Sequence, residues 1–572
     1  MINVLFDWPE SVALSPRSRL DYKVIVTPSE CPAIDASFSV SEPDDIREEQ
    51  RMNSTDVSCQ TLIDTLRRTA ARQPDKPAIK QGDVHWTYSQ FYQRCTEVAG
   101  GMSELGVSAG DRVAILSRNS VTFALARYAV AAAGAVLVPV NFMLNATEAA
   151  YIVGHSESKL LLVGKDELDN ASQLPALCPD LQHSVWMGSE EGLATPDGMM
   201  PFSDLYSAPP LAAAQGLDTD LPAQIIYTSG TESAPKGAVL THSAIIWQYA
   251  SCLVDAEITE EDSHLHSMPL YHCAQLDVFL GPSIQVGGRN VITDDSSPEN
   301  LLALLESESI STFFAPPTVW ISLLNSPKFD QTDLSALRKG YYGAAIMPVE
   351  IMKKIQQRIP QIRLWNLYGQ TEIAPVATIL KPADQLRKPG SAGRPVLNVE
   401  TRIVDDEGLD VAVGDIGEVV HRSPQLLSEY YKDPERTAEA FAGGWFHSGD
   451  LATIDDEGYI TIVDRKKDMI KTGGENVSGR EVEEAIYQLA DIAEVAVIGL
   501  PHSHWIEAVS AVIVSQAGKS LSEEAVIDHC ATILAGFKVP KKIIFVEELP
   551  RNPSGKILKR DLRVNYAGAF QE

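Results

Sequence analysis

The sequence has few cysteines, and none of them falls in a spacing that indicates a structural role. There are seven, an odd number, and no C-x-x-C pair occurs. This pattern argues against a disulfide framework and a cysteine zinc site, so reduced thiols are expected. The N-terminus also lacks the cationic and apolar regions of a signal peptide, which favours a cytoplasmic protein.

Long apolar runs are missing as well. No stretch approaches the ~18 apolar residues of a membrane-spanning helix. The nearest, Phe123–Val140, is interrupted by Arg127 and Gly134 and fits a helix followed by a strand. No transmembrane segment is therefore expected, while a peripheral membrane contact and a homodimer stay open.

Positive charge is scarce. The chain carries 47 Lys and Arg against 77 Asp and Glu, a net charge of −30. Proteins that bind nucleic acid need a basic face to displace counterions, so no nucleic-acid partner is expected. An anionic nucleotide substrate would have to be held by a few local cations and backbone N–H groups.

The order of predicted elements indicates an α/β protein with several parts. A chain of 572 residues exceeds what one core normally supports. Residues 1–51 are rich in Pro, Ser and acidic residues without sustained periodicity, and we interpret them as an N-terminal extension. From residue 52 to 466, short apolar strands alternate with helices, as in the strand 111–116 and the helix 121–133. This alternation predicts βαβ crossovers and parallel sheets in a large domain.

Two further modules follow in the sequence. Short, hairpin-linked strands around 401–404 and 417–420 predict a small barrel-like module. Residues 467–572 predict a small α+β C-terminal domain. The charged run Asp464–Asp468 just before this domain is a natural hinge.

A loop rich in Gly, Ser and Thr carries the first sign of chemistry. The apolar strand ending at Tyr227 enters Thr228–Gly237, and a helix follows from about Thr241. Such a loop offers hydroxyl and backbone N–H groups to phosphate oxygens, with a lysine to neutralise charge. It lacks the spacing of a Walker A loop. The candidate nucleotide-binding residues are Thr228, Ser229, Gly230, Thr231 and Lys236, and Thr228 is also a candidate catalytic residue.

This loop resembles the signature Y-T-S-G-T-T-G-x-P-K-G of the superfamily of acyl-CoA synthetases, peptide-synthetase adenylation domains and luciferases. Glu232 and Ser233 stand where that family has Thr and Gly. The resemblance implies stacked, mostly parallel sheets in a large N-terminal domain and a small, mobile C-terminal lid. It also implies AMP-forming chemistry that uses ATP, Mg²⁺ and coenzyme A.

A second segment, Tyr368-Gly-Gln-Thr-Glu372, is only a polar turn when taken alone, but it resembles the second signature of the superfamily. There the aromatic ring packs on adenine, the Thr meets phosphate and the Glu holds Mg²⁺. The resemblance implies that Tyr368, Gly369 and Thr371 bind the nucleotide and that Glu372 is a catalytic metal ligand. The turn made by Gly343, Ala344 and Ala345 resembles the family's small-residue segment against the adenine edge.

The segments around the predicted hinge resemble the family as well. Asp450 matches the residue that accepts both ribose hydroxyls, and Arg465 matches a residue near the ribose and phosphate. Lys471, Gly473 and Gly474 match the strip that meets the pantetheine arm of CoA.

Near the C-terminus, Lys556 matches the lysine that catalyses adenylation in the family. A carboxylate that attacks the α-phosphate brings two negative charges together, and a lysine on the reacting oxygens stabilises the transition state. The neighbouring Lys559 and Arg560 are interpreted as surface cations.

The acyl-binding part is the least defined. The segment Pro269–Gln275 resembles the P-L-[FY]-H segment of fatty-acyl-CoA synthetases and makes His272 a candidate catalytic residue at the acyl entrance. Phe314, Trp320 and Tyr342 are wall candidates, although aromatic residues are usually plain core. A medium- or long-chain fatty acid is the first expectation. A branched, aryl or sulfur-containing acid stays open.

Three other functions compete with this expectation. Amino-acid adenylation is disfavoured, because those domains usually carry an Asp in the segment of Tyr271 and His272. An acyl-AMP ligase that loads an acyl carrier protein is the nearest enzymatic alternative. A catalytically silent acyl- or nucleotide-binding protein would not need all four of Lys236, Glu372, Asp450 and Lys556.

Overall fold

A computed structural model gives the fold of most of the chain. It describes residues 60–211, 218–228, 235–343, 345, 347–489, 491–516, 518–519, 521–551 and 557–570. The predicted N-terminal extension, 1–51, lies outside this part of the chain. Within it, no helix is long and apolar enough to cross a membrane, and five cysteines are buried, free thiols.

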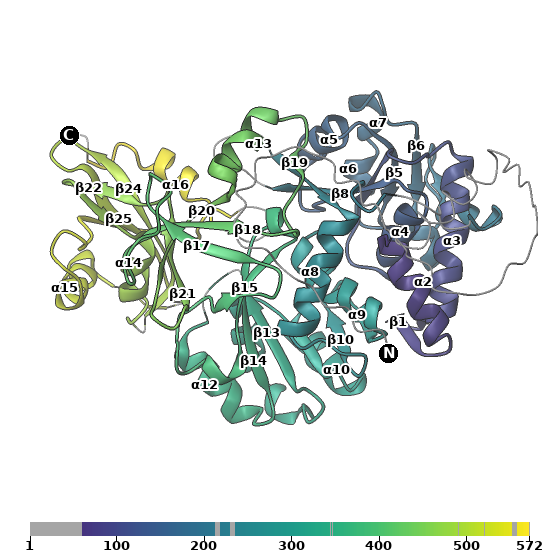
Figure 1. Cartoon of the computed structure of the whole chain (residues 1–572). Coiled ribbons are helices and arrows are strands. Elements are labelled where there is room, and N and C mark those ends of the chain that lie inside the picture. Colours follow the sequence, from purple (N-terminus) through teal and green to yellow (C-terminus); the bar gives the residue numbers. More distant parts are fainter. Residues whose placement is uncertain are drawn as a thin grey trace, which may run out of the picture. The chain divides into compact units, whose positions relative to one another are not determined.

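One sheet has eight strands in the order β19-β9-β8-β4-β3-β5-β6-β7. Figure 1 labels β19, β8, β5 and β6 of this sheet. Neighbours from β8 to β7 are parallel, whereas β8–β9 and β9–β19 are antiparallel. The central strands β3 and β4 are apolar and almost wholly buried, as parallel strands covered on both faces must be. The strands are β3 (Arg112–Leu116), β4 (Val136–Val140), β5 (Ser158–Val163), β6 (His183–Trp186), β7 (Met200–Pro201), β8 (Pro222–Thr228), β9 (Lys236–Thr241) and β19 (Glu429–Tyr430).

A second sheet has nine strands in the order β16-β15-β14-β13-β12-β10-β11-β1-β2. The run from β14 to β1 is parallel, and antiparallel strands close both edges. The strands are β1 (Pro77–Gln81), β2 (Val84–Thr87), β10 (Ser263–His266), β11 (Arg289–Ile292), β12 (Thr312–Phe314), β13 (Lys339–Gly343), β14 (Arg363–Gly369), β15 (Val376–Leu380) and β16 (Arg394–Pro395).

Two helices lie between these sheets. The helix α4 contacts β4 of the first sheet and β1 of the second, while α8 contacts β9 and β15. Every residue of α4 is buried, which its apolar composition allows. The Ser120 and Thr241 side chains cap the two helices by accepting hydrogen bonds from backbone N–H groups of their first turns.

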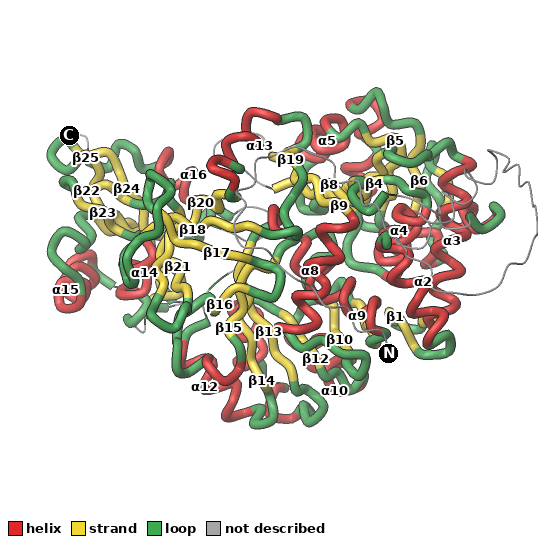
Figure 2. Tube along the Cα trace, viewed as in Figure 1, coloured by secondary structure: helices red, strands yellow, loops and turns green. Residues whose placement is uncertain are grey.

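The helices of this large domain cover the outer faces of the sheets or lie between them (Figure 2). They are α2 (Leu62–Arg72), α3 (Tyr88–Glu104), α4 (Val121–Ala132), α5 (Ala146–His155), α6 (Leu168–Ala171), α7 (Leu174–Leu177), α8 (His242–Asp255), α9 (Gly281–Val286), α10 (Pro298–Ser307), α11 (Pro317–Asn325), α12 (Val349–Arg358) and α13 (Pro434–Ala440). A π-helical segment, η3 (Ala274–Leu280), follows His272 directly.

The predicted small module is a four-stranded antiparallel sheet in the order β17-β18-β20-β21. A separate, mostly antiparallel sheet with helices α14–α16 forms the small C-terminal domain. The predicted α/β fold is therefore confirmed. The proposed boundary at 466/467 falls between the two sheets and stays a prediction. The elements are β17 (Glu400–Val404), β18 (Gly417–Arg422), β20 (Phe446–Ile454), β21 (Ile460–Arg465), β22 (Ile470–Thr472), β23 (Glu475–Val477), β24 (Ile492–His502), β25 (Ile506–Ser515), β26 (Lys542–Phe545), α14 (Gly479–Ile486), α15 (Glu523–Ile533) and α16 (Lys559–Asn565).

The interpretation of Lys559 as a surface cation is wrong. Its Nζ pairs with Glu483 Oε1 at 2.9 Å, and the two side chains are only 19% and 18% exposed. The pair ties the start of α16 to α14. Because Glu483 lies in a helix much earlier in the sequence, the cations around Lys559 do not indicate this ion pair.

Four buried histidines make stability depend on pH. Burial lowers the pKa of His242, His264 and His421 to about 4, and that of His266 to about 3. The unfolded chain binds these protons near pH 6.5, whereas the folded chain binds them only at lower pH. The free energy of unfolding should therefore fall as the pH drops from about 6.5 toward 4, by roughly 2 kcal/mol per histidine at pH 5.

Denaturant unfolding at several pH values tests this expectation. The variant His421→Gln should fall less steeply between pH 6.5 and 5, because it has one titrating group fewer. A free energy of unfolding that stays constant from pH 7 to 5 would contradict the expectation.

Candidate active site

The predicted phosphate loop is held by a β-hairpin. Strands β8 and β9 pair so that Thr228 lies opposite Lys236 and Tyr227 opposite Gly237. The loop thus leaves and re-enters the sheet at adjacent points. A Cβ on Gly237 would lie 2.7 Å from the Ile225 side chain, so glycine is required there. The predicted residues Ser229, Gly230 and Thr231 lie outside the described residues.

Helix α5 supports both ends of this loop. The Tyr151 hydroxyl donates to the Pro235 carbonyl at 3.3 Å. The Tyr227 hydroxyl lies 2.8 Å from Nδ1 of His155. Tyr151 and His155 are four residues apart and therefore lie on one face of the helix. The two strands that carry Thr228 and Lys236 are thus fixed from outside as well as by pairing with each other.

Glu372, Lys236 and Tyr430 form the centre of the site. Glu372 is buried, and its Oε1 accepts a hydrogen bond from the Tyr430 hydroxyl at 2.9 Å. Lys236 Nζ lies 5.1 Å from the centre of the Tyr430 ring. Burial lowers the pKa of Lys236, and the positive charge of Arg436 lowers it further. The Glu372 carboxylate acts in the opposite direction and raises this pKa. A cation and a carboxylate therefore flank one tyrosine beside the loop.

The donor set beside the loop suits Mg²⁺. This ion prefers oxygen ligands and is usually bound by one or two carboxylates together with substrate phosphates. Glu372 supplies a carboxylate, and Thr371 adds a hydroxyl from the adjacent position in the chain. The residues present thus fit a magnesium ion that enters with ATP.

Asp450 lies between two partners. Its Oδ2 accepts from the Tyr368 hydroxyl at 2.6 Å, and its Oδ1 pairs with Arg465 Nε at 2.6 Å. Asp450 and Arg465 face each other across β20 and β21. Burial and the Asp450 charge raise the pKa of Tyr368, so its hydroxyl keeps its proton. Each carboxylate oxygen can accept more than one hydrogen bond, so the two ribose hydroxyls can still be bound.

Close backbone approaches explain the glycines next to Tyr368. At Gly369, where φ is 159°, an added Cβ would lie 1.9 Å from the Pro375 carbonyl oxygen. At Gly343 it would lie 2.7 Å from the Leu367 carbonyl oxygen. Ala345 is exposed, and Ala344 lies outside the described residues. Glycine at these two positions therefore lets neighbouring backbone segments pack closely around the ends of β13 and β14.

His272 lies beside these groups. His272 is an exposed residue. The many protein atoms around its ring nevertheless displace water and lower its pKa. The Ala274 N–H donates to His272 Nδ1 at 3.1 Å, so the proton of the neutral ring is on Nε2. The next residue, Cys273, has its Sγ 3.4 Å from Thr371 Oγ1. The segment of His272 and Cys273 therefore adjoins the predicted nucleotide-binding segment.

Comparison with known proteins agrees with this arrangement. A family model described as AMP-binding enzyme matches residues 66–431, well over half of the chain. A second model, the AMP-binding enzyme C-terminal domain, matches residues 481–556. The chain belongs to the AMP-binding enzyme family.

Three members of this family illustrate the similarity. The feruloyl-CoA synthase of an Amycolatopsis species is 34% identical over 87% of this chain and 98% of its own. The long-chain-fatty-acid–CoA ligase of Mycobacterium tuberculosis is 35% identical over 88% of this chain and 98% of its own. A crystal structure of an anthranilate CoA ligase with anthranoyl-AMP matches with a TM-score of 0.82 at 28% identity, covering 89% of this chain and 98% of its own.

The superfamily resemblance is thus confirmed, and the chain is an AMP-forming acid–CoA ligase that uses ATP, Mg²⁺ and CoA. The roles of the individual residues are not tested by these comparisons and stay predictions.

The predicted thiol-binding strip of this AMP-binding enzyme lies on the small domain. Lys471 is exposed on β22, and its backbone N–H donates to Glu507 Oε2 at 2.7 Å. Gly473 and Gly474 form the turn into β23 with φ of 60° and 91°, conformations that favour glycine. The catalytic candidate Lys556 lies outside the described residues.

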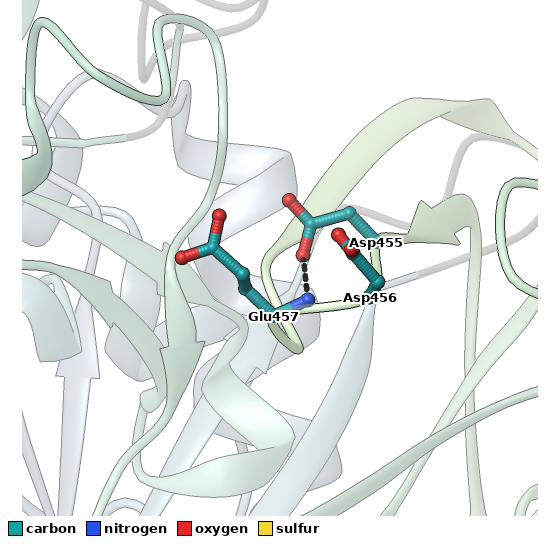
Figure 3. A group of neighbouring side chains, drawn as sticks. All are labelled: Asp455, Asp456 and Glu457. Atoms are coloured by element: carbon teal, nitrogen blue, oxygen red, sulfur yellow. Dashed lines mark hydrogen bonds between the residues drawn. The ribbon is translucent and has the colours of Figure 1, made fainter.

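A group of carboxylates lies apart from the site. Asp455, Asp456 and Glu457 form the turn between β20 and β21 (Figure 3). Asp455 Oδ1 accepts from the backbone N–H groups of Glu457 and Tyr459 at 3.0 and 2.8 Å. Lys388 pairs with both Asp455 and Glu457 at 2.6 Å. These contacts explain the acidic turn as a structural feature of the AMP-binding enzyme.

The candidate wall residues of the acyl pocket separate into two kinds. Trp320 and Tyr342 are 1% and 3% exposed and belong to the apolar core around α11 and α12, so they are plain core. Phe314 stacks on Phe279 of the π-helical segment with ring centres 4.6 Å apart. Of the three, Phe314 is thus the one packed against the segment that follows His272.

Proposed function

We propose that this ligase activates a medium- or long-chain fatty acid, with no charged group besides its carboxylate, and transfers the acyl group to CoA. The observation that carries this proposal is the apolar setting of Tyr271, the residue before His272. Tyr271 is 7% exposed, and its ring packs edge-on against Phe142 with ring centres 5.5 Å apart. Such a setting would disfavour a second carboxylate or an ammonium group on the acid.

The similarity to a long-chain-fatty-acid–CoA ligase supports the same class of acid. An aryl acid with no other charged group is the second candidate, because feruloyl-CoA synthase and the anthranilate ligase are comparably similar. Both candidates share an apolar body and a single reactive carboxylate.

In the proposed first step, an oxygen of the acid attacks the α-phosphorus of ATP, and the bond to pyrophosphate breaks. Lys236 and the loop hydroxyls would hold the phosphates, and Asp450 would hold the ribose. Mg²⁺, when bound through Glu372, would neutralise phosphate charge. Lys556 would stabilise the charge on the reacting oxygens. His272, with its proton on Nε2, would donate a hydrogen bond to the acid.

In the proposed second step, the CoA thiol attacks the acyl carbon of the acyl-adenylate. The thiol loses its proton, the bond to AMP breaks, and a thioester forms. The strip of Lys471, Gly473 and Gly474 would receive the pantetheine arm. Before this step, rotation of the small domain about Asp464–Asp468 would exchange Lys556 for that strip.

A panel of acids assayed for AMP release with and without CoA tests the proposal. We expect octanoate and dodecanoate to support AMP release, whereas malonate and free amino acids should not. Ferulate and indoleacetate measure the second candidate. Preferential use of a dicarboxylate or an amino acid would contradict the proposal. A rate with ferulate that exceeds the rates with all aliphatic acids would replace the first candidate by the second.

A further inference from the structure

Tyr430 is the residue of the site that the sequence motifs did not point to. It lies on β19, a two-residue strand that pairs with β9 so that Tyr430 faces Ala238. This pairing places the tyrosine beside the strand that begins with Lys236. Its backbone N–H donates to Thr437 Oγ1 at 2.9 Å, which fixes the strand to α13. Tyr430 therefore has little freedom to move.

Two contacts join this segment to Glu372. The Tyr430 hydroxyl donates to Glu372 Oε1 at 2.9 Å, and the Leu427 N–H donates to the Glu372 carbonyl at 2.8 Å. The segment thus holds both the side chain and the backbone of the carboxylate residue. Tyr430 and Glu372 are 58 positions apart in the sequence, so only the fold brings them together.

The ring of Tyr430 faces a cation. Lys236 Nζ lies 5.1 Å from the ring centre, within the range of a cation–π contact. A tyrosine hydroxyl is protonated near neutral pH, so it is the donor to the Glu372 carboxylate at 2.9 Å. One side chain therefore orients a carboxylate with its hydroxyl and a lysine with its ring.

We propose that Tyr430 is a positioning residue that aims Glu372 at the metal of Mg·ATP and holds Lys236 against the phosphates. With Oε1 engaged by Tyr430, Oε2 is the oxygen offered to the metal. Partners of this kind in the outer coordination shell typically change metal affinity by about 10- to 100-fold. The proposal rests on the role of Glu372 under the proposed function.

The variant Tyr430→Phe removes the hydroxyl and keeps the ring. ATP binding is measured by calorimetry without acid or CoA, once with Mg²⁺ and once with EDTA. We expect ATP affinity in Mg²⁺ to fall by about 10-fold, since the metal ligand loses its partner, and affinity in EDTA to stay unchanged. The variant Tyr430→Leu also removes the ring and should weaken binding in EDTA, because Lys236 is no longer held.

Tyr459→Phe is the matched control. The Tyr459 hydroxyl also donates to a carboxylate, Asp384 Oδ2 at 2.7 Å, and Lys388 Nζ lies 5.0 Å from the centre of its ring. It lies on the turn of the small module and outside the proposed site. Removing its hydroxyl should leave ATP binding unchanged in both conditions, which separates a loss of stability from a loss of metal binding.

Glu372→Gln separates this inference from the proposed function. If Glu372→Gln weakens binding in Mg²⁺ and Tyr430→Phe adds nothing in that background, the inference holds. If Glu372→Gln weakens binding and Tyr430→Phe alone does not, the role of Tyr430 is refuted while the site stands. If Glu372→Gln has no effect that depends on Mg²⁺, both the metal assignment and the inference are refuted. An equal loss for Tyr430→Phe in Mg²⁺ and EDTA would refute the inference as well.

Discussion

Replacing Lys556 by alanine is expected to slow acyl-adenylate formation by about 10²- to 10³-fold, the usual effect of removing one group that stabilises transition-state charge. Thioester formation from supplied acyl-adenylate and CoA should stay largely intact, because that step does not bring two anions together. The two half-reactions are measured separately, the first as acid-dependent pyrophosphate release and the second as AMP release from acyl-adenylate.

Lys519→Ala is the control for this variant. Lys519 is an exposed lysine of the same domain, paired with Asp491 at 3.3 Å. Its loss should change neither half-reaction. An equal decrease of both half-reactions in Lys556→Ala would contradict the assigned role.

Replacing Asp450 by alanine is expected to weaken ATP binding by about 10-fold or more, because hydrogen bonds to a charged group contribute roughly 1.5–3 kcal/mol each. The variant loses the acceptor for the ribose and leaves Tyr368 and Arg465 without the partners they have at 2.6 Å. Affinity for the acid should change little. Tyr368→Phe keeps the carboxylate and should have a smaller effect.

Deoxynucleotides make this test specific. If Asp450 accepts the ribose hydroxyls, the unmodified enzyme should bind 2′-deoxy-ATP and 3′-deoxy-ATP more weakly than ATP. The variant Asp450→Ala should bind all three about equally. Discrimination that is as strong in the variant as in the unmodified enzyme would show that Asp450 acts through the fold and not through the ribose.

The parts of the site that sequence reasoning found are those encoded locally. Tyr368 lies near the end of strand β14, and Thr371 and Glu372 follow this strand within a few residues. The structure brings Tyr368 to Asp450 and Glu372 to Lys236. The parallel sheets were predictable for the same reason, because β-branched runs such as β4 alternate with apolar helices.

Other features depend on partners far away in the chain. The run after Lys236 was not recognised as a strand, because a short apolar segment is ambiguous until its pairing with β8 is known. Strand β10 ends at His266, shortly before Pro269, which has no N–H for a sheet ladder. Tyr430 stands in no recognised motif. Its proposed role follows from its contacts with Glu372 and Lys236, which only the fold brings together.

The most direct test of the account is the exchange of labelled pyrophosphate into ATP in the absence of CoA. The account predicts exchange that requires an acid with a single carboxylate and an apolar body, such as dodecanoate, and that is lost in Glu372→Gln. The same variant should keep most of its thioester formation from supplied acyl-adenylate. Exchange that needs no acid, or that persists unchanged in Glu372→Gln, would contradict the claim that this site adenylates the acid.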